Sequence, residues 1–394
     1  MCAIGVTSPP LPGNVKAGDA MSLAGTSLEA EPARHAFAHS ARVGEIAALA
    51  GRNALLGLLT LTLYRFWART RMRRRLWART ELLGDPLEYT GKGGELFRGF
   101  LLSLPTFFLP AIFVLYLAPL AFDTATAGLM FLAFYAVAVP LINAARYWMR
   151  RYQLSRTRWR GIRLSLEGSG WAYAWASIGW SLLEAITLGW FHPVARMRRA
   201  QLLWAHTRFG DQPFAFTEAH EDLARGLYGP FALAWIGTPF AFFGAFVLGG
   251  FAAASAGYNP ANISTPLEIA LSVAAFASLF VLAALLVLLV WAPFNAAAMN
   301  RTAALLTIDG ARFELKATTL GLYGVTLAGA LIFALSLGFL APLAGALYVR
   351  YVFNRLTMIG QPRFAEIGQS IVPEEKAGEG IADAFDLDLG VGVV

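Results

Sequence analysis

Long apolar runs are separated along this chain by short basic stretches and by segments in which polar and apolar residues alternate. Four runs reach the roughly 17 to 20 residues that a helix needs to cross the apolar core of a bilayer. These runs cover residues 99–122, 127–143, 227–251 and 269–294. The links at 123–126 and 252–268 contain no Lys or Arg. The pattern therefore predicts two transmembrane helical hairpins, within residues 98–145 and 227–294.

Three further apolar segments carry a recurring motif. The motif reads TLTLYRF at 60–66, TLGWFHP at 187–193 and SLGFLAP at 336–342. Each copy ends 20 residues before a proline, namely Pro86, Pro213 or Pro362. Constant spacing of this kind indicates duplicated architecture. We expect one membrane domain over 34–366 with three internal repeats, at 34–89, 161–216 and 310–364.

The basic residues predict on which side of the membrane these segments end, because Lys and Arg collect in cytoplasmic loops. If all seven apolar segments crossed, the basic groups at 196–225 and 301–316 would lie outside. If only the two hairpins cross, every basic group is cytoplasmic. We therefore expect the three motif segments to be re-entrant or membrane-inserted elements, and a plain seven-span bundle is the alternative.

Short segments of alternating polarity flank these elements and predict strands. They lie at 37–39, 87–89, 164–166, 214–216, 313–315 and, less clearly, at Phe364. With so few residues in strands, the expected fold class is an all-α polytopic membrane protein that carries short cytoplasmic β-strands.

Composition agrees with a membrane protein: 57% of residues are hydrophobic, 14% are charged, and the mean hydropathy is +0.54. The net charge of +7 follows from arginine-rich stretches next to the apolar segments. Residues 1–33 are expected to form a disordered tail, and 371–394 an acidic C-terminal tail.

Arginine-rich helices with flanking tryptophan are typical of the headgroup layer of a membrane. We interpret these helices first as a topology signal, and specific binding of anionic lipid or another anionic ligand is the alternative. Nucleic acid is not expected as a partner. The candidate contact residues are Arg71, Arg73, Arg74, Arg75, Arg150, Arg151, Arg198 and Arg199.

Polar residues at membrane depth are a second group of candidates, because burying them is costly. Glu184 lies inside an apolar segment and is a candidate proton or cation site. The alternative is that it faces the cytoplasm or pairs with a nearby arginine. Asn143 and Asn295 end equivalent apolar segments, each shortly after a proline. We interpret these two residues as caps or interhelical hydrogen-bonding groups, with a pathway-lining role as the alternative.

Catalytic signatures are missing from the sequence. Cys2 is the sole cysteine, the five histidines form no metal-binding motif, and Gly91-Lys92 does not fit a phosphate loop. We therefore expect no catalytic residue, no metal and no cofactor, and a protein that is not an enzyme.

The stretch RTRWRGIRLSLEG, followed by TLGWFHPVARMRR and LLWAHTRFGDQPFAF, resembles the YjgN family of bacterial inner-membrane proteins, which is defined by a domain of unknown function. The resemblance covers roughly Arg34 to Glu366. The first motif departs from it, with Thr62 in place of glycine and Phe66 in place of proline. The resemblance implies a multi-pass protein of the cytoplasmic membrane and supplies no catalytic residue, cofactor or substrate.

Two classes of function remain open. The first is a non-enzymatic membrane module whose basic cytoplasmic face contacts anionic lipid, a protein partner or a second copy of the chain. The second is a transporter or channel for a small solute or ion, built on broken helices.

Overall fold

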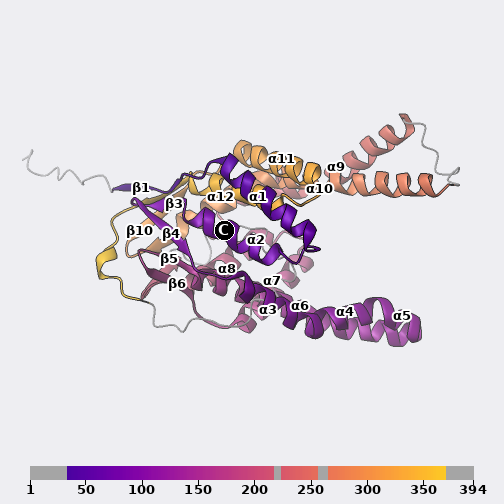
Figure 1. Ribbon diagram of the computed structural model, residues 1–394, viewed down its shortest axis with the longest axis horizontal. Helices are drawn as coiled ribbons and strands as arrows, with labels where there is room; N and C mark the ends of the chain where they lie inside the picture. The colour runs from indigo at the N-terminus through magenta and orange to yellow at the C-terminus, as the bar shows by residue number, and fades with distance from the viewer. Residues whose placement is uncertain (1–32, 217–222, 256–264, 370–394) are drawn as a thin grey trace, which may run out of the picture. The chain divides into compact units, whose positions relative to one another are not determined.

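Eleven short strands form one continuous antiparallel sheet in the computed structural model, which describes residues 33–216, 223–255 and 265–369 (Figure 1). The strand order is β1-β11-β10-β9-β8-β7-β6-β5-β4-β3-β2. The strands are β1 (Arg34–Ala36), β2 (Ala38–His39), β3 (Thr80–Leu82), β4 (Asp85–Tyr89), β5 (Thr157–Trp159), β6 (Ile162–Leu166), β7 (Thr207–Phe209), β8 (Gln212–Phe216), β9 (Leu306–Ile308), β10 (Ala311–Leu315) and β11 (Leu356–Ile359). Because the edge strands β1 and β2 are separated only by Phe37, the sheet nearly closes on itself.

Tight turns join successive strand pairs. Leu83-Gly84, Arg160-Gly161 and Asp309-Gly310 each place two consecutive residues at positive φ. This backbone matches the type I′ turn, whose twist suits a two-residue β-hairpin. Glycine at the second position carries no steric penalty there.

The helices fill the chain between these β-hairpins. They are α1 (Val43–Leu59), α2 (Arg65–Trp77), α3 (Gly93–Ser103), η1 (Leu104–Phe108), α4 (Leu109–Ile112), η2 (Phe113–Leu117), α5 (Ala118–Ala121), α6 (Thr124–Ser155), α7 (Gly170–Ile186), α8 (His192–Ala205), α9 (Tyr228–Ser255), α10 (Pro266–Leu305), α11 (Thr319–Ser336), α12 (Ala341–Phe353) and the 3-10 turn η4 (Phe364–Glu366). The π-helical turns η1 and η2 occur in a stretch that contains Pro105 and Pro110, which lack the backbone N–H of a regular helix.

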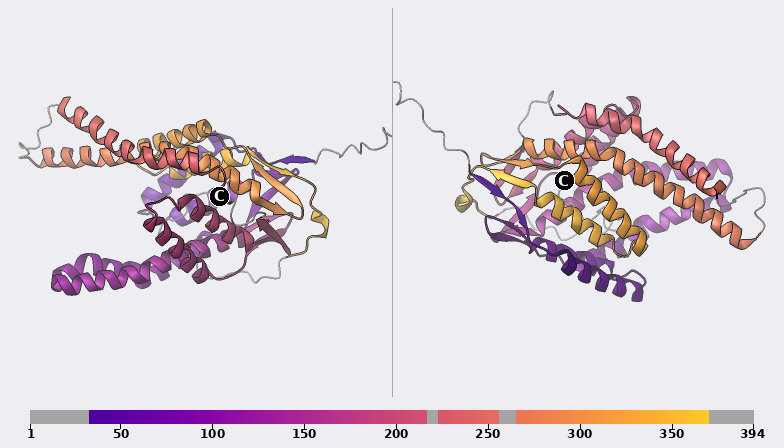
Figure 2. Two further views of the ribbon diagram at one scale, coloured as in Figure 1. Left: turned by 180° about the vertical axis from the view of Figure 1, so that it is seen from behind. Right: turned by 90° about the horizontal axis from the view of Figure 1, so that it is seen from above.

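Each helical unit leaves the sheet from one strand and returns to the neighbouring strand. Residues flanking the five units are paired directly in the sheet. The pairs are His39 with Thr80, Tyr89 with Thr157, Leu166 with Thr207, Phe216 with Leu306, and Leu315 with Leu356. Figures 1 and 2 show the helices leading away from the strands toward the same side. Three short helix pairs (α1–α2, α7–α8 and α11–α12) thus alternate with two long ones (α3–α6 and α9–α10).

The short pairs share one turn geometry. The first motif residue, Thr60, Thr187 or Ser336, donates its hydroxyl to the carbonyl four residues earlier and accepts the N–H four residues later. The next two residues have positive φ in every pair: Leu61-Thr62, Leu188-Gly189 and Leu337-Gly338. The motif therefore encodes a tight reversal between two antiparallel helices. Thr62 adopts this backbone despite its branched side chain.

Several apolar clusters hold the sheet and the helices together, and two of them bear on the position of the first helix pair. One lies on the sheet, where Trp159, Phe209 and Met358 are buried. The segment after β11 covers this core, with the Phe364 ring edge-on to Trp159 at 4.7 Å between centroids. A second core joins α1 and α2 to α12, where Ile46 is fully buried.

The predicted all-α fold class is wrong, because the structure contains an eleven-stranded sheet that organises every helical unit. The plain seven-span bundle is wrong for the same reason. Strands occur at five of the six predicted places, whereas Phe364 begins a 3-10 turn. The partner strands β3, β5, β7 and β9 were not predicted, since three residues are too few to show an alternating pattern.

Among the described residues, five helical segments are long and apolar enough to cross a membrane. They are Gly93–Ala121, Thr124–Ser155, Tyr228–Ala252, Pro266–Leu305 and Thr319–Ser336. The first four correspond to the predicted transmembrane hairpins, and the fifth is helix α11, which was expected to be part of a re-entrant element. The predicted N-terminal tail, apart from Ala33, and the predicted acidic C-terminal tail lie outside the described residues.

Candidate functional site

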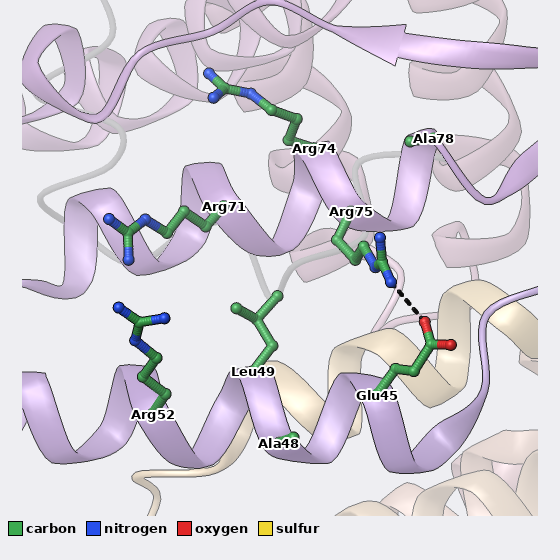
Figure 3. A pocket seen from close by; sticks show the side chains of 8 residues that line it. All are labelled: Glu45, Ala48, Leu49, Arg52, Arg71, Arg74, Arg75 and Ala78. Atoms are coloured by element: carbon green, nitrogen blue, oxygen red, sulfur yellow. Dashed lines mark hydrogen bonds and ion pairs between the residues drawn. The ribbon is translucent and has the colours of Figure 1, made fainter.

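An open groove between α1 and α2 gathers arginine side chains, and we take it as the candidate functional site (Figure 3). Its volume is about 620 Å³. It is lined by Glu45, Ala48, Leu49, Arg52, Arg71, Arg74, Arg75 and Ala78. We call it the arginine groove. Four arginines and a single carboxylate are among its lining residues, and the guanidinium groups of Arg52, Arg71 and Arg75 point toward α1 or the space between the helices.

Helical spacing explains why these side chains meet. Residues 45, 48, 49 and 52 follow one another at three- and four-residue steps and share one face of α1. Ile46, Ala50 and Asn53 form the neighbouring stripe, which is buried. The tight turn at 60–64 then brings α2 back antiparallel, so that residues 71, 74, 75 and 78 face the first set.

Glu45 neutralises the end of the groove nearer the sheet. Its Oε2 accepts a hydrogen bond from Arg75 Nη2 at 2.6 Å and lies 3.4 Å from Arg79 Nη2. These bonds and charges lower the pKa of the Glu45 carboxyl, with the hydrogen bond from Arg75 as the main cause. Arg74 points away from the groove and donates to the Gly91 carbonyl at 2.9 Å.

Among the residues that the structure describes, Arg52 and Arg71 have no acidic partner. Figure 3 shows their guanidinium groups turned toward each other across the groove. Arg71 also lies 5.4 Å above the centre of the Tyr64 ring, a cation–π contact that holds its side chain in place. Among the carboxylates of the described residues, none pairs with either arginine. Two like charges therefore face the same space.

The remaining predicted arginines do not join this groove. Arg73 is buried on the opposite face of α2, where its Nη1 donates to the Tyr89 hydroxyl at 3.4 Å. Arg150 lies over the Trp204 ring at 5.4 Å, and Arg151 follows it on α6. Arg198 donates to Gln201 one turn along α8 at 3.3 Å. The arginine clusters are thus separate surfaces on different helix pairs.

Glu184 lies in a polar cluster near the turn between α7 and α8. Its Oε1 accepts from Arg199 Nη1 at 2.8 Å, and its Oε2 lies 3.4 Å from His192 Nδ1. Arg199 also donates to the Ser181 hydroxyl at 2.9 Å. The structure therefore places the predicted Glu184 and Arg199 together as an ion pair within one helix pair.

The two predicted asparagines differ in their surroundings. Asn295 Oδ1 accepts from Arg196 Nη1 at 2.7 Å, which links α10 to α8. Asn143 donates to the Val139 carbonyl of its own helix at 2.9 Å, and Arg146 Nη1 lies 3.5 Å from its Oδ1. Asn295 thus connects two helix pairs, whereas Asn143 bonds within α6.

Arg52 is the functional candidate that sequence reasoning missed. Arg52 stands alone at the start of the apolar run that leads into the first motif, so it was assigned to no basic cluster. Its position eight residues before Thr60 was a usable signal, because the hairpin folds back and brings α2 alongside it. The described residues contain no group of three or more His, Cys, Asp or Glu side chains arranged to hold a metal.

The model of a bacterial protein family of unknown function, DUF898, matches residues 34–384. The chain belongs to this family, which is the same family that the sequence motifs resembled. No curated protein and no solved structure gives a significant match.

Proposed function

We propose that this protein is a non-enzymatic module of the bacterial cytoplasmic membrane whose basic cytoplasmic face binds anionic phospholipid. The observation that carries the proposal is the pairing of the strands on either side of every helical unit. A sheet lies on one side of a bilayer, because an open sheet edge in hydrocarbon leaves backbone groups without partners. Every helical unit then enters and leaves the membrane from the sheet side.

The distribution of charge supports a cytoplasmic position for the sheet. The turn between α5 and α6, farthest along the chain from the strands of its unit, contains Asp123 and no basic residue. On α6, Arg146, Arg150 and Arg151 instead lie toward the end of the helix that is nearer the sheet. This distribution supports a cytoplasmic sheet, because Lys and Arg collect on the cytoplasmic side of a membrane. The three short helix pairs are then re-entrant elements, and their shared turn supports a common origin by duplication.

The geometry favours lipid contact over transport. Glu184, the candidate coupling residue, is already paired with Arg199 and His192. The arginine groove is open to its surroundings and is lined by α1 and α2 alone. Each arginine near an anionic membrane surface contributes about 1 kcal/mol, so several together select anionic over neutral lipid.

The proposal is tested by measuring which lipids surround the full-length protein. Polymer-bounded discs are extracted from vesicles that contain phosphatidylcholine and phosphatidylglycerol in equal amounts, and their lipid is quantified. We expect the ratio of phosphatidylglycerol to phosphatidylcholine in the discs to be several-fold higher than in the starting mixture at low salt, and to rise less at about 0.5 M salt because ions screen the attraction. Discs with the starting composition would contradict the proposal.

A further inference from the structure

The arginine groove has a counterpart in the third short helix pair. A second open groove, of about 260 Å³, lies between α11 and α12. It is lined by Gly324, Val325, Ala328, Leu347, Arg350, Tyr351, Asn354 and Arg355. When Thr60 is aligned with Ser336, seven of the eight positions that line the arginine groove correspond to residues of this second groove. The groove therefore occurs at equivalent places in two of the short helix pairs, α1–α2 and α11–α12.

The two grooves differ in the charge at equivalent positions. Ala328 stands at the position of Arg52, and Leu347 at the position of Arg71. The middle pair, α7–α8, has Gly179 and Arg198 at these positions. The same fold thus forms with two, one or no cations there. Folding does not require Arg52 and Arg71, and facing like charges oppose it.

The position of Arg52 along α1 matches the headgroup layer under the proposed orientation. Nine residues, about 14 Å of helix, separate it from the start of α1 at the sheet. Asn295, which ends the apolar stretch of α10, lies a similar ten residues, about 15 Å, from the sheet end of its helix. Arg52 is therefore at the level where the apolar part of the long hairpin begins.

The turn at residues 60–64, beyond Arg52, presents exposed leucines that suit insertion into hydrocarbon. It lies about 12 Å farther along α1 than Arg52. Leu59 is 73% exposed and Leu61 86% exposed, and Leu58 is exposed beside them. An apolar tip of this size fits the roughly 5–10 Å insertion of interfacial elements. A lipid whose chains lie beside this tip has its phosphate near the arginine groove.

We infer that the arginine groove is a specific phospholipid site in which Arg52 and Arg71 bind the headgroup phosphate between them. This inference rests on the proposed function and adds a particular site to it. Both guanidinium groups present planar sets of N–H donors that match phosphate oxygens. A bound phosphate supplies the negative charge that the facing pair lacks. Tyr64 beneath Arg71 limits the ordering cost of binding.

The test uses the full-length protein in neutral detergent, titrated with short-chain phosphatidylglycerol. We expect the Arg52→Gln/Arg71→Gln double variant to bind at least about 10-fold more weakly than the wild type, since two charge-assisted contacts are lost. The Arg225→Ala/Arg312→Ala variant is the matched control. It removes the same charge from exposed positions outside the groove, and we expect binding within about 2-fold of the wild type.

Inorganic phosphate distinguishes a lipid site from a site for a free anion. We expect inorganic phosphate to displace the lipid only weakly, because it lacks the chains that lie beside the apolar tip. Equal affinity for inorganic phosphate would overturn the assignment to lipid. Equal lipid affinity in the wild type and the groove variant would overturn the site, as would an equal loss in the matched control.

A gain-of-function variant keeps the test decisive if the groove variant fails to fold. Ala328→Arg/Leu347→Arg recreates the facing pair on α11–α12, where both residues line the second groove. We expect a second equivalent of phosphatidylglycerol to bind, and a single equivalent would contradict the inference. If the discs show enrichment while the groove variants bind as the wild type does, only the specific site fails. Absence of enrichment in the wild type removes the proposed function as well.

Discussion

His39 shows how one buried side chain makes the stability of the sheet depend on pH. Its Nδ1 lies 2.8 Å from the Thr80 hydroxyl, and its Nε2 is buried without a partner among the described residues. Burial, and secondarily the charge of Arg350, lowers the pKa of His39 from 6.5 to about 4. The folded protein therefore holds this imidazole neutral at pH values where the unfolded chain protonates it.

We predict that the free energy of unfolding falls as the pH is lowered from 6.5 to about 4, because only the unfolded state gains the proton in this range. The contribution of His39 is up to about 3 kcal/mol. This loss of stability is absent above pH 6.5 and complete below about pH 4. Denaturant unfolding of the wild type and of His39→Gln across this range isolates the effect. Identical pH slopes in the two proteins would refute it.

At the scale of the element, the helix-turn-helix unit tolerates a substitution that its copies avoid. Thr62 has φ 70°, whereas the equivalent positions carry Gly189 and Gly338 at φ 91° and 86°. A branched residue pays a steric cost in this left-handed region that glycine does not. The turn nevertheless forms, because the two hydrogen bonds of the Thr60 hydroxyl and the packing of α1 on α2 stabilise it by more than the strain costs.

We predict that Thr62→Gly raises the stability of the protein in detergent by about 1 kcal/mol, because the strain at positive φ is removed. Thr62→Ala is the matched control. It removes the branch and keeps the Cβ atom, so its gain is smaller. Thermal unfolding midpoints of the three proteins measure the order, and a less stable glycine variant would contradict the explanation.

Sequence reasoning located the three motif copies and the four long apolar segments, because motif spacing and apolar length are visible along the chain. It predicted six short strands, but not that eleven strands form one sheet that joins every helical unit. Thr157–Trp159 and Thr207–Phe209 become strands by pairing with their neighbours, and three residues carry no periodic signal. Three of the four groove arginines, Arg71, Arg74 and Arg75, could be predicted because they stand in one basic run. Arg52 could not, because it meets them only when α2 folds back alongside α1.

At the scale of the whole molecule, the sheet determines which ends of the helices share a compartment. Under the proposed orientation, every strand faces the cytoplasm, and the turns of the long helix pairs reach the opposite side. Because the strands pair directly with each other, none can lie across the membrane from its neighbour.

Single cysteines test this arrangement in intact cells after the native thiol is removed by Cys2→Ser. We predict that an impermeant maleimide labels Asp123→Cys, at the turn between α5 and α6. Glu88→Cys and Arg312→Cys, at exposed sheet positions, are labelled only after the membrane is permeabilised. Labelling of either sheet position from outside would disprove the orientation.

The nearly closed sheet also constrains the order in which a newly made chain can fold. Strand β1 pairs with β11 alone, and Arg34 lies opposite Ile359. At roughly 5 to 20 residues per second, a ribosome takes on the order of 15 to 60 seconds to make the intervening chain. For that time β1 has no partner of its own. The nascent protein therefore cannot complete its sheet until β11 has been made. Truncation before β11 leaves β1 without a partner, and β10 with only β9.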